Sequence, residues 1–91
     1  MLDASPRALV QAPPLYPHEA KIRGFEGEVL VAFTVDESGH VISVQVLGSS
    51  DPIFEKAARL AVGKWRFEPG RRQGRVVRFA MTVPIVFHLN Q

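Results

Sequence analysis

The three histidines are the first candidates for chemistry, because imidazole is a common metal ligand and a frequent general base. They are His18, His40 and His88. A zinc site needs ligands at close, recurring spacing or beside paired carboxylates. These histidines fall at a predicted helix start, in a predicted turn and at the end of a predicted strand, so the sequence predicts no metal site.

Nucleophilic catalysis has no better support. The chain contains no cysteine, which excludes thiolate nucleophiles, disulfides and iron–sulfur ligation together. Ser49 and Ser50 lack the glycine-flanked elbow of hydrolases, and no His/Asp partner is evident for them. Gly24 and Gly27 do not make a phosphate-cradling loop. We therefore expect no catalytic residue and no cofactor.

A local basic excess is the strongest charge feature. The net charge is only +2, but the first half of the chain is acidic and the second half is basic. Most of the basic excess lies in one run whose only acid is Glu68, and its members are Lys64, Arg66, Arg71, Arg72, Arg75 and Arg78. Two interpretations stay open, a patch for an anionic partner or a solubilising loop.

The composition indicates one small globular domain. The 91 residues are 46% hydrophobic and 22% charged, which is too apolar for a disordered tail, and the chain is too short for two cores. No stretch approaches the roughly 20 apolar residues of a membrane-spanning helix, and no signal peptide opens the chain, so we expect a soluble fragment. Four of the seven prolines lie in the first seventeen residues, which predicts an extended, polyproline-like lead-in.

The first half should contain a short helix and a hairpin. Tyr16-Pro17 starts the helix and Gly24 ends it, since proline is favoured at the first helical position. Large apolar residues at the odd positions of Glu28–Val35 predict a strand with one buried face. The turn residues 36–39 follow, and alternation then resumes, so residues 28–47 should form a hairpin.

The second half should contain one long helix and one long strand. Asp51-Pro52 is a helix start signal, and apolar residues recur at three- and four-residue steps as far as Trp65. This predicts an amphipathic helix of about four turns. After Glu68-Pro69-Gly70 a basic loop should run to Gly74, and period-two alternation then predicts a strand over Arg75–Leu89.

The order strand, strand, helix, strand predicts an α+β fold in which a helix covers one side of an antiparallel sheet. The aromatic side chains fall on the faces that should be buried, or at a helix end. We therefore assign them to the core rather than to a base-stacking platform. They are Phe33, Phe54, Trp65, Phe67, Phe79 and Phe87.

Pro84 predicts that the last strand lies at an edge of the sheet, because a residue without an amide hydrogen is tolerated only at an edge or a bulge. An edge strand must be protected from aggregation or can receive an extended peptide, and both interpretations stay open. Backbone groups of successive strand residues alternate sides. If Pro84 lies in regular register, the residues that present backbone groups to the open edge are Val76, Arg78, Ala80 and Thr82.

Several short motifs follow one another in order between Tyr16 and Leu89. They are Tyr16-Pro17, Glu26-Gly27-Glu28-Val29, Phe33-Thr34-Val35-Asp36 with Gly39, Phe54 with Ala57-Ala58, Trp65-Arg66-Phe67-Glu68-Pro69-Gly70 and Val83-Pro84-Ile85-Val86-Phe87. Each is weak alone, but together their order and separations make the chain resemble the C-terminal domain of the TonB family of periplasmic energy transducers. This places the end of a proline-containing linker at residues 1–15 and a TonB-like C-terminal domain at residues 16–91.

The resemblance implies a three-stranded antiparallel sheet packed on one face by two helices, one short and one long, and no enzymatic activity. It also implies a periplasmic domain of an inner-membrane-anchored protein, whose anchor and proline-rich spacer are absent from this sequence. An ExbB/ExbD-type motor would act through that absent region. The family domain binds the TonB box, a short segment of TonB-dependent outer-membrane transporters, as a strand beside its own last strand. It thereby transmits the inner-membrane proton-motive force for uptake of siderophores, haem or vitamins.

Carried onto this chain, the resemblance places the partner-binding residues in two segments. The accepting strand comprises Arg75, Val76, Val77, Arg78, Phe79, Ala80, Met81, Thr82 and Val83. The segment that lies near the box comprises Pro13, Pro14, Leu15, Tyr16 and Pro17. The chain departs from the best-known pattern here, because Pro13 and Leu15 stand where glutamines are often found, and Glu19 stands where a basic residue can occur.

Two other functions stay open. A TolA-like envelope-bridging domain shares the fold but binds different proteins, and the motif at residues 65–69 favours TonB over it. A nucleic-acid-binding module is motivated by the basic run, and counterion release would make its affinity fall steeply with salt; we expect no nucleic-acid partner. The open edge also predicts that the isolated fragment pairs with a second copy as a homodimer.

Overall fold

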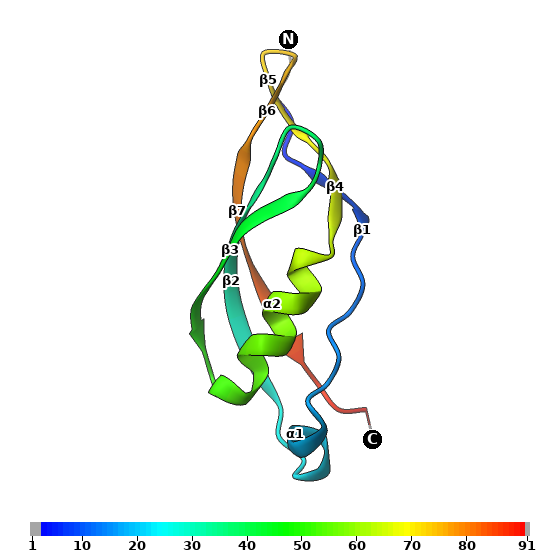
Figure 1. Cartoon of the computed structure of the whole chain (residues 1–91), viewed down its shortest axis with the longest axis vertical. Coiled ribbons are helices and arrows are strands. Elements are labelled where there is room, and N and C mark those ends of the chain that lie inside the picture. The colour runs from blue at the N-terminus through cyan, green and yellow to red at the C-terminus, as the bar shows by residue number, and fades with distance from the viewer. Residues whose placement is uncertain (1–2, 91) are drawn as a thin grey trace.

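A three-stranded antiparallel sheet forms the centre of the structure, a computed structural model that describes residues 3–90. The strands lie in the order β3-β2-β7, with bounds Val41–Ser49, Gly27–Val35 and Phe79–Phe87. Helix α2 (Glu55–Gly63) lies across one face of the sheet, and the short α1 (His18–Ile22) lies at one end of the molecule (Figure 1). The predicted α+β fold, with one short and one long helix, is confirmed.

The hairpin of β2 and β3 has the turn that its residues predict. The Asp36 carboxylate accepts hydrogen bonds from the amides of Ser38 and His40, each 2.9 Å long. Gly39 has φ +85°, and a Cβ at this position would lie 2.0 Å from the carbonyl oxygen of Phe67. Glycine therefore lets the end of the hairpin approach the chain that follows α2.

The core lies between the sheet and α2. It is built from the odd positions of β2, the inner face of α2, the end of β7 and the aromatic residues that follow the helix. Its main side chains are Val29, Val31, Phe33, Val35, Phe54, Ala58, Val62, Trp65, Phe67, Ile85 and Phe87. Phe79 is only half-buried, whereas the other aromatic residues assigned to the core are buried. Within residues 3–90, no helix is long and apolar enough to cross a membrane.

The long helix is shorter than predicted. Asp51 caps it as expected, since its carboxylate accepts a hydrogen bond from the Ile53 amide at 3.0 Å. However, Pro52–Phe54 forms a 3-10 turn (η1), and α2 ends at Gly63. Trp65 lies beyond the helix, although its side chain is only 4% exposed. The apolar period therefore continued past the helix because the next residues also face the core.

The predicted last strand is divided in two. Arg75–Val77 forms β6, which pairs with β5 (Gly70–Arg72) in a separate hairpin, and β7 begins only at Phe79. The reason is that β2 ends at Val35, opposite Phe79, so the chain before Phe79 has no partner in the central sheet. The basic loop predicted before Gly74 is thus largely strand.

The described part of the N-terminal segment, from residue 3, is extended as predicted, but it is also paired. Arg7–Val10 forms β1, which is antiparallel to β4 (Arg66–Glu68). The Arg7 guanidinium lies 2.9 Å from the Glu68 carboxylate. This segment runs from the β5–β6 end of the molecule along α2 towards α1 (Figure 1).

Candidate functional site

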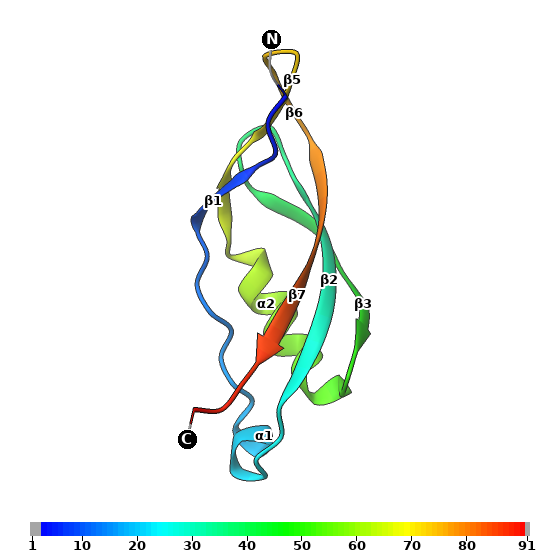
Figure 2. The ribbon, with the colours of Figure 1, turned by 180° about the vertical axis from the view of Figure 1, so that it is seen from behind.

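The free edge of β7 is the feature on which the candidate site depends. Figure 2 views the sheet from behind, with β2 on one side of β7, whose other side carries no strand of the central sheet. The pairing of β2 with β7 is unbroken from Gly27–Phe87 to Val35–Phe79. Pro84 lies within this strand, so the edge position that it predicted is confirmed.

Hydrogen bonds on the far side of β2 establish which backbone groups of β7 are unpaired. The Ser50 amide donates to the Glu28 carbonyl oxygen, and the Glu28 amide donates to Ser50 Oγ. Both hydrogen bonds are 2.9 Å long. The backbone of Glu28 therefore faces away from β7, and that of Val29 faces towards it. Because Val29 pairs with Ile85, the backbone of Ile85 faces β2 and that of Pro84 faces the open edge.

The same alternation extends along the whole strand, since its register with β2 has no bulge. The residues whose backbone groups face the open edge are Ala80, Thr82, Pro84 and Val86. Their side chains are exposed, whereas the odd-numbered side chains are half-buried or buried against the core. The parity predicted from Pro84 therefore holds in β7, and a strand added here would extend the sheet.

The second predicted segment lies beside α2. Residues 12–17 and α2 enclose an open, mainly apolar groove of about 540 Å³. Leu15 stands at this groove with 86% of its surface exposed, and Leu60 of α2 is 55% exposed. The prolines make this segment stiff and deprive it of amide donors at Pro13, Pro14 and Pro17.

Tyr16 fixes the segment to the end of β7. Its ring packs edge-on against Phe54 and Phe87, with centroid distances of 5.9 and 5.6 Å, and its hydroxyl donates to the Phe25 carbonyl oxygen. Partial burial, followed by the nearby Glu26 carboxylate, raises the pKa of Tyr16 above its ordinary value. The hydroxyl therefore stays protonated and continues to donate at neutral pH.

The predicted site residues are only partly brought together. Phe79–Val83 forms the free edge, but Arg75–Val77 belongs to the β5–β6 hairpin and Arg78 lies between the two strands. The free edge also continues beyond the predicted site residues, through Pro84 to Val86. The alternation of apolar residues that predicted the strand also runs through these positions, so the sequence already indicated that they belong to the strand.

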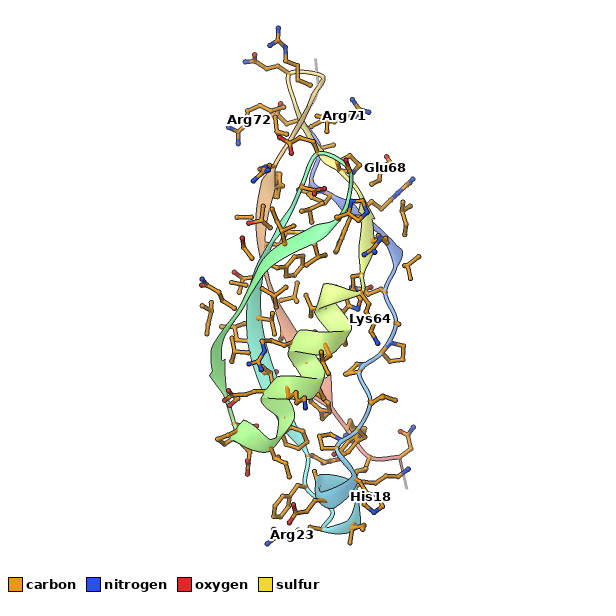
Figure 3. All side chains as sticks on the ribbon, in the orientation of Figure 1. His18, Arg23, Lys64, Glu68, Arg71 and Arg72 are labelled. Atoms are coloured by element: carbon orange, nitrogen blue, oxygen red, sulfur yellow. The ribbon has the colours of Figure 1, made fainter. Side chains whose placement is uncertain are left out.

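The candidate metal ligands are dispersed. His40 Nδ1 lies 3.9 Å from the Asp36 carboxylate, and His88 Nδ1 lies 2.9 Å from the Glu26 carboxylate. His18 lies at the start of α1, at the lower end of the view in Figure 3. Over residues 3–90, no three His, Cys, Asp or Glu side chains are grouped so that they could hold a metal ion.

Sequence comparisons give a consistent result. Residues 12–89 match the family described as Gram-negative bacterial TonB protein C-terminal. Protein TonB of Pseudomonas aeruginosa is 37% identical over 90 residues, which cover 98% of this chain and 26% of that protein. Protein TonB of Escherichia coli K12 is 36% identical over 88 residues, which cover 96% of this chain and 35% of that protein. The chain thus spans about a quarter to a third of these curated relatives.

Solved structures agree with the sequence comparisons. The solution NMR structure of the Pseudomonas aeruginosa TonB CTD has a TM-score of 0.82 and 36% identity, with 100% of this chain and 93% of that chain covered. The TonB2 protein of Vibrio anguillarum has a TM-score of 0.71 and 29% identity, with coverages of 97% and 85%. These matches do not favour the TolA-like alternative. The chain belongs to the family of C-terminal domains of Gram-negative bacterial TonB proteins.

Proposed function

We propose that this domain is the transporter-binding part of a TonB-like energy transducer. It captures the TonB box of TonB-dependent outer-membrane transporters and transmits the inner-membrane proton-motive force for nutrient uptake. In this proposal it is the periplasmic domain of an inner-membrane-anchored protein that an ExbB/ExbD-type motor drives. Membership of the family supports the proposal, and the observation that carries it is the free backbone edge of β7.

Strand addition at this edge needs few specific side chains. Outward amides at Ala80, Thr82 and Val86 would donate to the docked strand, and carbonyl oxygens at the same positions and at Pro84 would accept from it. Backbone hydrogen bonds supply affinity in this mode, while side-chain pockets supply specificity. One domain of this kind can therefore serve several transporters.

The proline segment would support the docked strand rather than form a matching strand. Tyr16 holds residues 13–17 close to Phe87, at the end of the accepting strand. With prolines at three of these five positions, the segment offers the docked strand few amide donors. Leu15 offers it an exposed apolar contact.

A peptide titration followed by amide NMR tests the proposal. A peptide with a TonB-box sequence should shift amide resonances along Phe79–Val86, and the Thr82 amide should gain protection from exchange. Because backbone pairing supplies the affinity, binding should fall only modestly between 50 and 500 mM salt, whereas affinity for duplex DNA would fall by orders of magnitude. Absence of saturable shifts in β7 would contradict strand addition at this edge.

A further inference from the structure

The tip of the β5–β6 hairpin brings two arginines face to face. Arg72 pairs directly with Arg75 across the two-residue turn Gln73-Gly74. Both turn residues have positive φ, +53° and +78°, as a type I′ hairpin turn requires. Like charges directly opposite each other destabilise a strand pair, so this arrangement favours an anion between or beside the two guanidinium groups.

These charges lack the ion pairs that their neighbours have. Arg7 lies 2.9 Å from Glu68, and Arg78 lies 3.1 Å from Glu37. Within residues 3–90, no ion pair involves Arg71, Arg72 or Arg75. Figure 3 places Arg71 and Arg72 at the same end of the molecule, on opposite sides of the hairpin.

One acid does lie at the tip, and it only partly balances the arginines. The Asp3 carboxylate accepts a hydrogen bond from the Gln73 amide at 2.8 Å. Its single charge faces three arginines, so the tip keeps a basic excess.

The opposite end of β7 is acidic. Glu28 pairs in register with Val86, and the Glu26 carboxylate accepts from the Leu89 amide at 2.7 Å while contacting His88. The free edge of β7 therefore has an acidic end at Phe87, whereas beyond Phe79, past the Arg78–Glu37 ion pair, it is continued by the basic tip of the hairpin.

The basic tip is held firmly against the start of this edge. A Cβ at Gly70 of β5 would lie only 2.8 Å from the ring of Phe79, so the hairpin packs closely on the first residue of β7. Arg75 pairs with Arg72 of β5 across the turn, so the backbone amide and carbonyl of Arg75 face β5. Because successive residues of a strand alternate sides, the backbone groups of Val76 face away from β5. A strand docked on β7 that extends past Phe79 would thus meet β6 and its arginines.

We propose that Arg72 and Arg75 contact one end of the strand docked on β7, and that they favour partners with carboxylates at that end. The preferred partner is an extended segment with an apolar centre and acidic residues at the end that lies beside Phe79. This inference rests on the proposed function, because it requires a strand docked on β7. It adds a charge-based selection that backbone pairing alone cannot supply.

Three peptides and two matched variants test this selection. The peptides share a neutral strand-forming centre; one is uncharged, one has two glutamates at its N-terminal end and one has them at its C-terminal end. The variant Arg72→Gln/Arg75→Gln removes the tip pair. The control Lys21→Gln/Arg59→Gln removes the same charge from exposed positions of α1 and α2 that do not line the groove, and no ion pair involves either side chain within the described residues.

At 50 mM salt at least one acidic peptide should bind about fivefold more tightly than the neutral peptide, in keeping with a few solvent-exposed charge contacts. The gain should disappear in the tip variant, persist in the control variant and shrink at 500 mM salt. The acidic peptide should also shift the amide resonances of Arg75 and Val76.

The remaining outcomes separate the two proposals. If the neutral peptide binds β7 but neither acidic peptide binds more tightly, the selection by Arg72 and Arg75 is wrong and strand addition stands. A gain that survives in the tip variant, or is lost equally in the control variant, also overturns it. If vesicles with anionic phospholipid bind through Arg72 and Arg75 while the peptides show no preference, the tip reads a lipid surface instead. If no peptide binds β7, both proposals fail.

Discussion

The indole nitrogen of Trp65 donates a hydrogen bond of 2.9 Å to the carbonyl oxygen of Ala12. This contact joins the chain just after α2 to the segment just before the prolines, 53 residues earlier. The same ring packs edge-on against Phe33, with centroids 6.1 Å apart. Trp65 therefore links the core to the N-terminal segment.

Trp65→Ala should lower the free energy of unfolding by roughly 3–5 kcal/mol, because it removes a large buried ring and leaves a cavity. Trp65→Phe keeps most of the packing but loses the bond to Ala12, so it should cost about 1–2 kcal/mol for the lost hydrogen bond and smaller ring. Urea unfolding measures both values. A loss under about 1 kcal/mol in the alanine variant would contradict the buried position of the ring.

Proline substitutions separate the outward and inward residues of β7. Thr82→Pro deletes an amide that faces the open edge, so the domain should fold while affinity for a docked peptide falls about tenfold or more. Met81→Pro deletes an amide that faces β2 opposite Phe33, and it should cost roughly 3 kcal/mol or more of stability. Circular dichroism and peptide titration distinguish the two. A Thr82→Pro variant that folds and binds like the parent would mean that the docking edge lies elsewhere.

Gly39→Ala should destabilise the domain more than Gly24→Ala. Both positions have positive φ, +85° and +71°, which costs roughly 1–2 kcal/mol for alanine. A Cβ at Gly39 would also meet the backbone oxygen of Phe67, whereas nothing lies within 4 Å of one at Gly24. Thermal unfolding of the two variants gives the comparison, and equal losses would argue against the close approach of the hairpin to β4.

The stability contributed by Asp36 should depend on pH. The amide of His40, and to a smaller extent that of Ser38, holds the pKa of Asp36 below its ordinary value. A depressed pKa in the folded state stabilises the protein above the unfolded-state pKa of about 4, and this contribution is lost as the pH falls through the folded-state pKa. Asp36→Asn should therefore be less stable than the parent at pH 7, and the difference should shrink towards pH 2. A difference that stays constant with pH would contradict this.

The free edge of β7 should let the isolated domain self-associate. An unpaired strand edge can pair with the same edge of a second copy around a two-fold axis. Sedimentation should reveal a concentration-dependent dimer, and a saturating docked peptide should return it to the monomer because both use one edge. A strict monomer at high concentration would reject this pairing.

Much of the central sheet could be predicted from the sequence because its residues carry strong local signals. The odd-numbered valines of β2 and the odd positions of β7 alternate over a full strand length, and Pro84 alone located the edge. Asp36, Gly39 and Asp51 marked turn and helix boundaries through hydrogen bonds with their own neighbours. Signals of this kind do not depend on the rest of the fold.

The short ladders could not be predicted, because β1 lies far from β4 in the sequence and most residues of β4 and β5 are polar. Arg66–Glu68 and Gly70–Arg72 are three residues long and mostly charged, so no apolar period identifies them as strands. Gln73 has a positive φ, which is uncommon for glutamine, so the sequence did not indicate the turn between β5 and β6. For the candidate site, the strand that forms the free edge from Phe79 onward was predicted from the alternation of apolar residues. The separation of β6 from β7 was not, because it depends on where β2 ends.

The pairing of β1 with β4 should be a late event when the domain folds. Its first pair joins residues 61 positions apart, and all four side chains of β1 are exposed, so the strand adds little to hydrophobic collapse. The β2–β3 hairpin closes across a short turn and buries a row of valines, so it should form before β1 pairs with β4. β1 should join last during refolding and open first in the native state, with faster hydrogen exchange at Ala8 than at Val31.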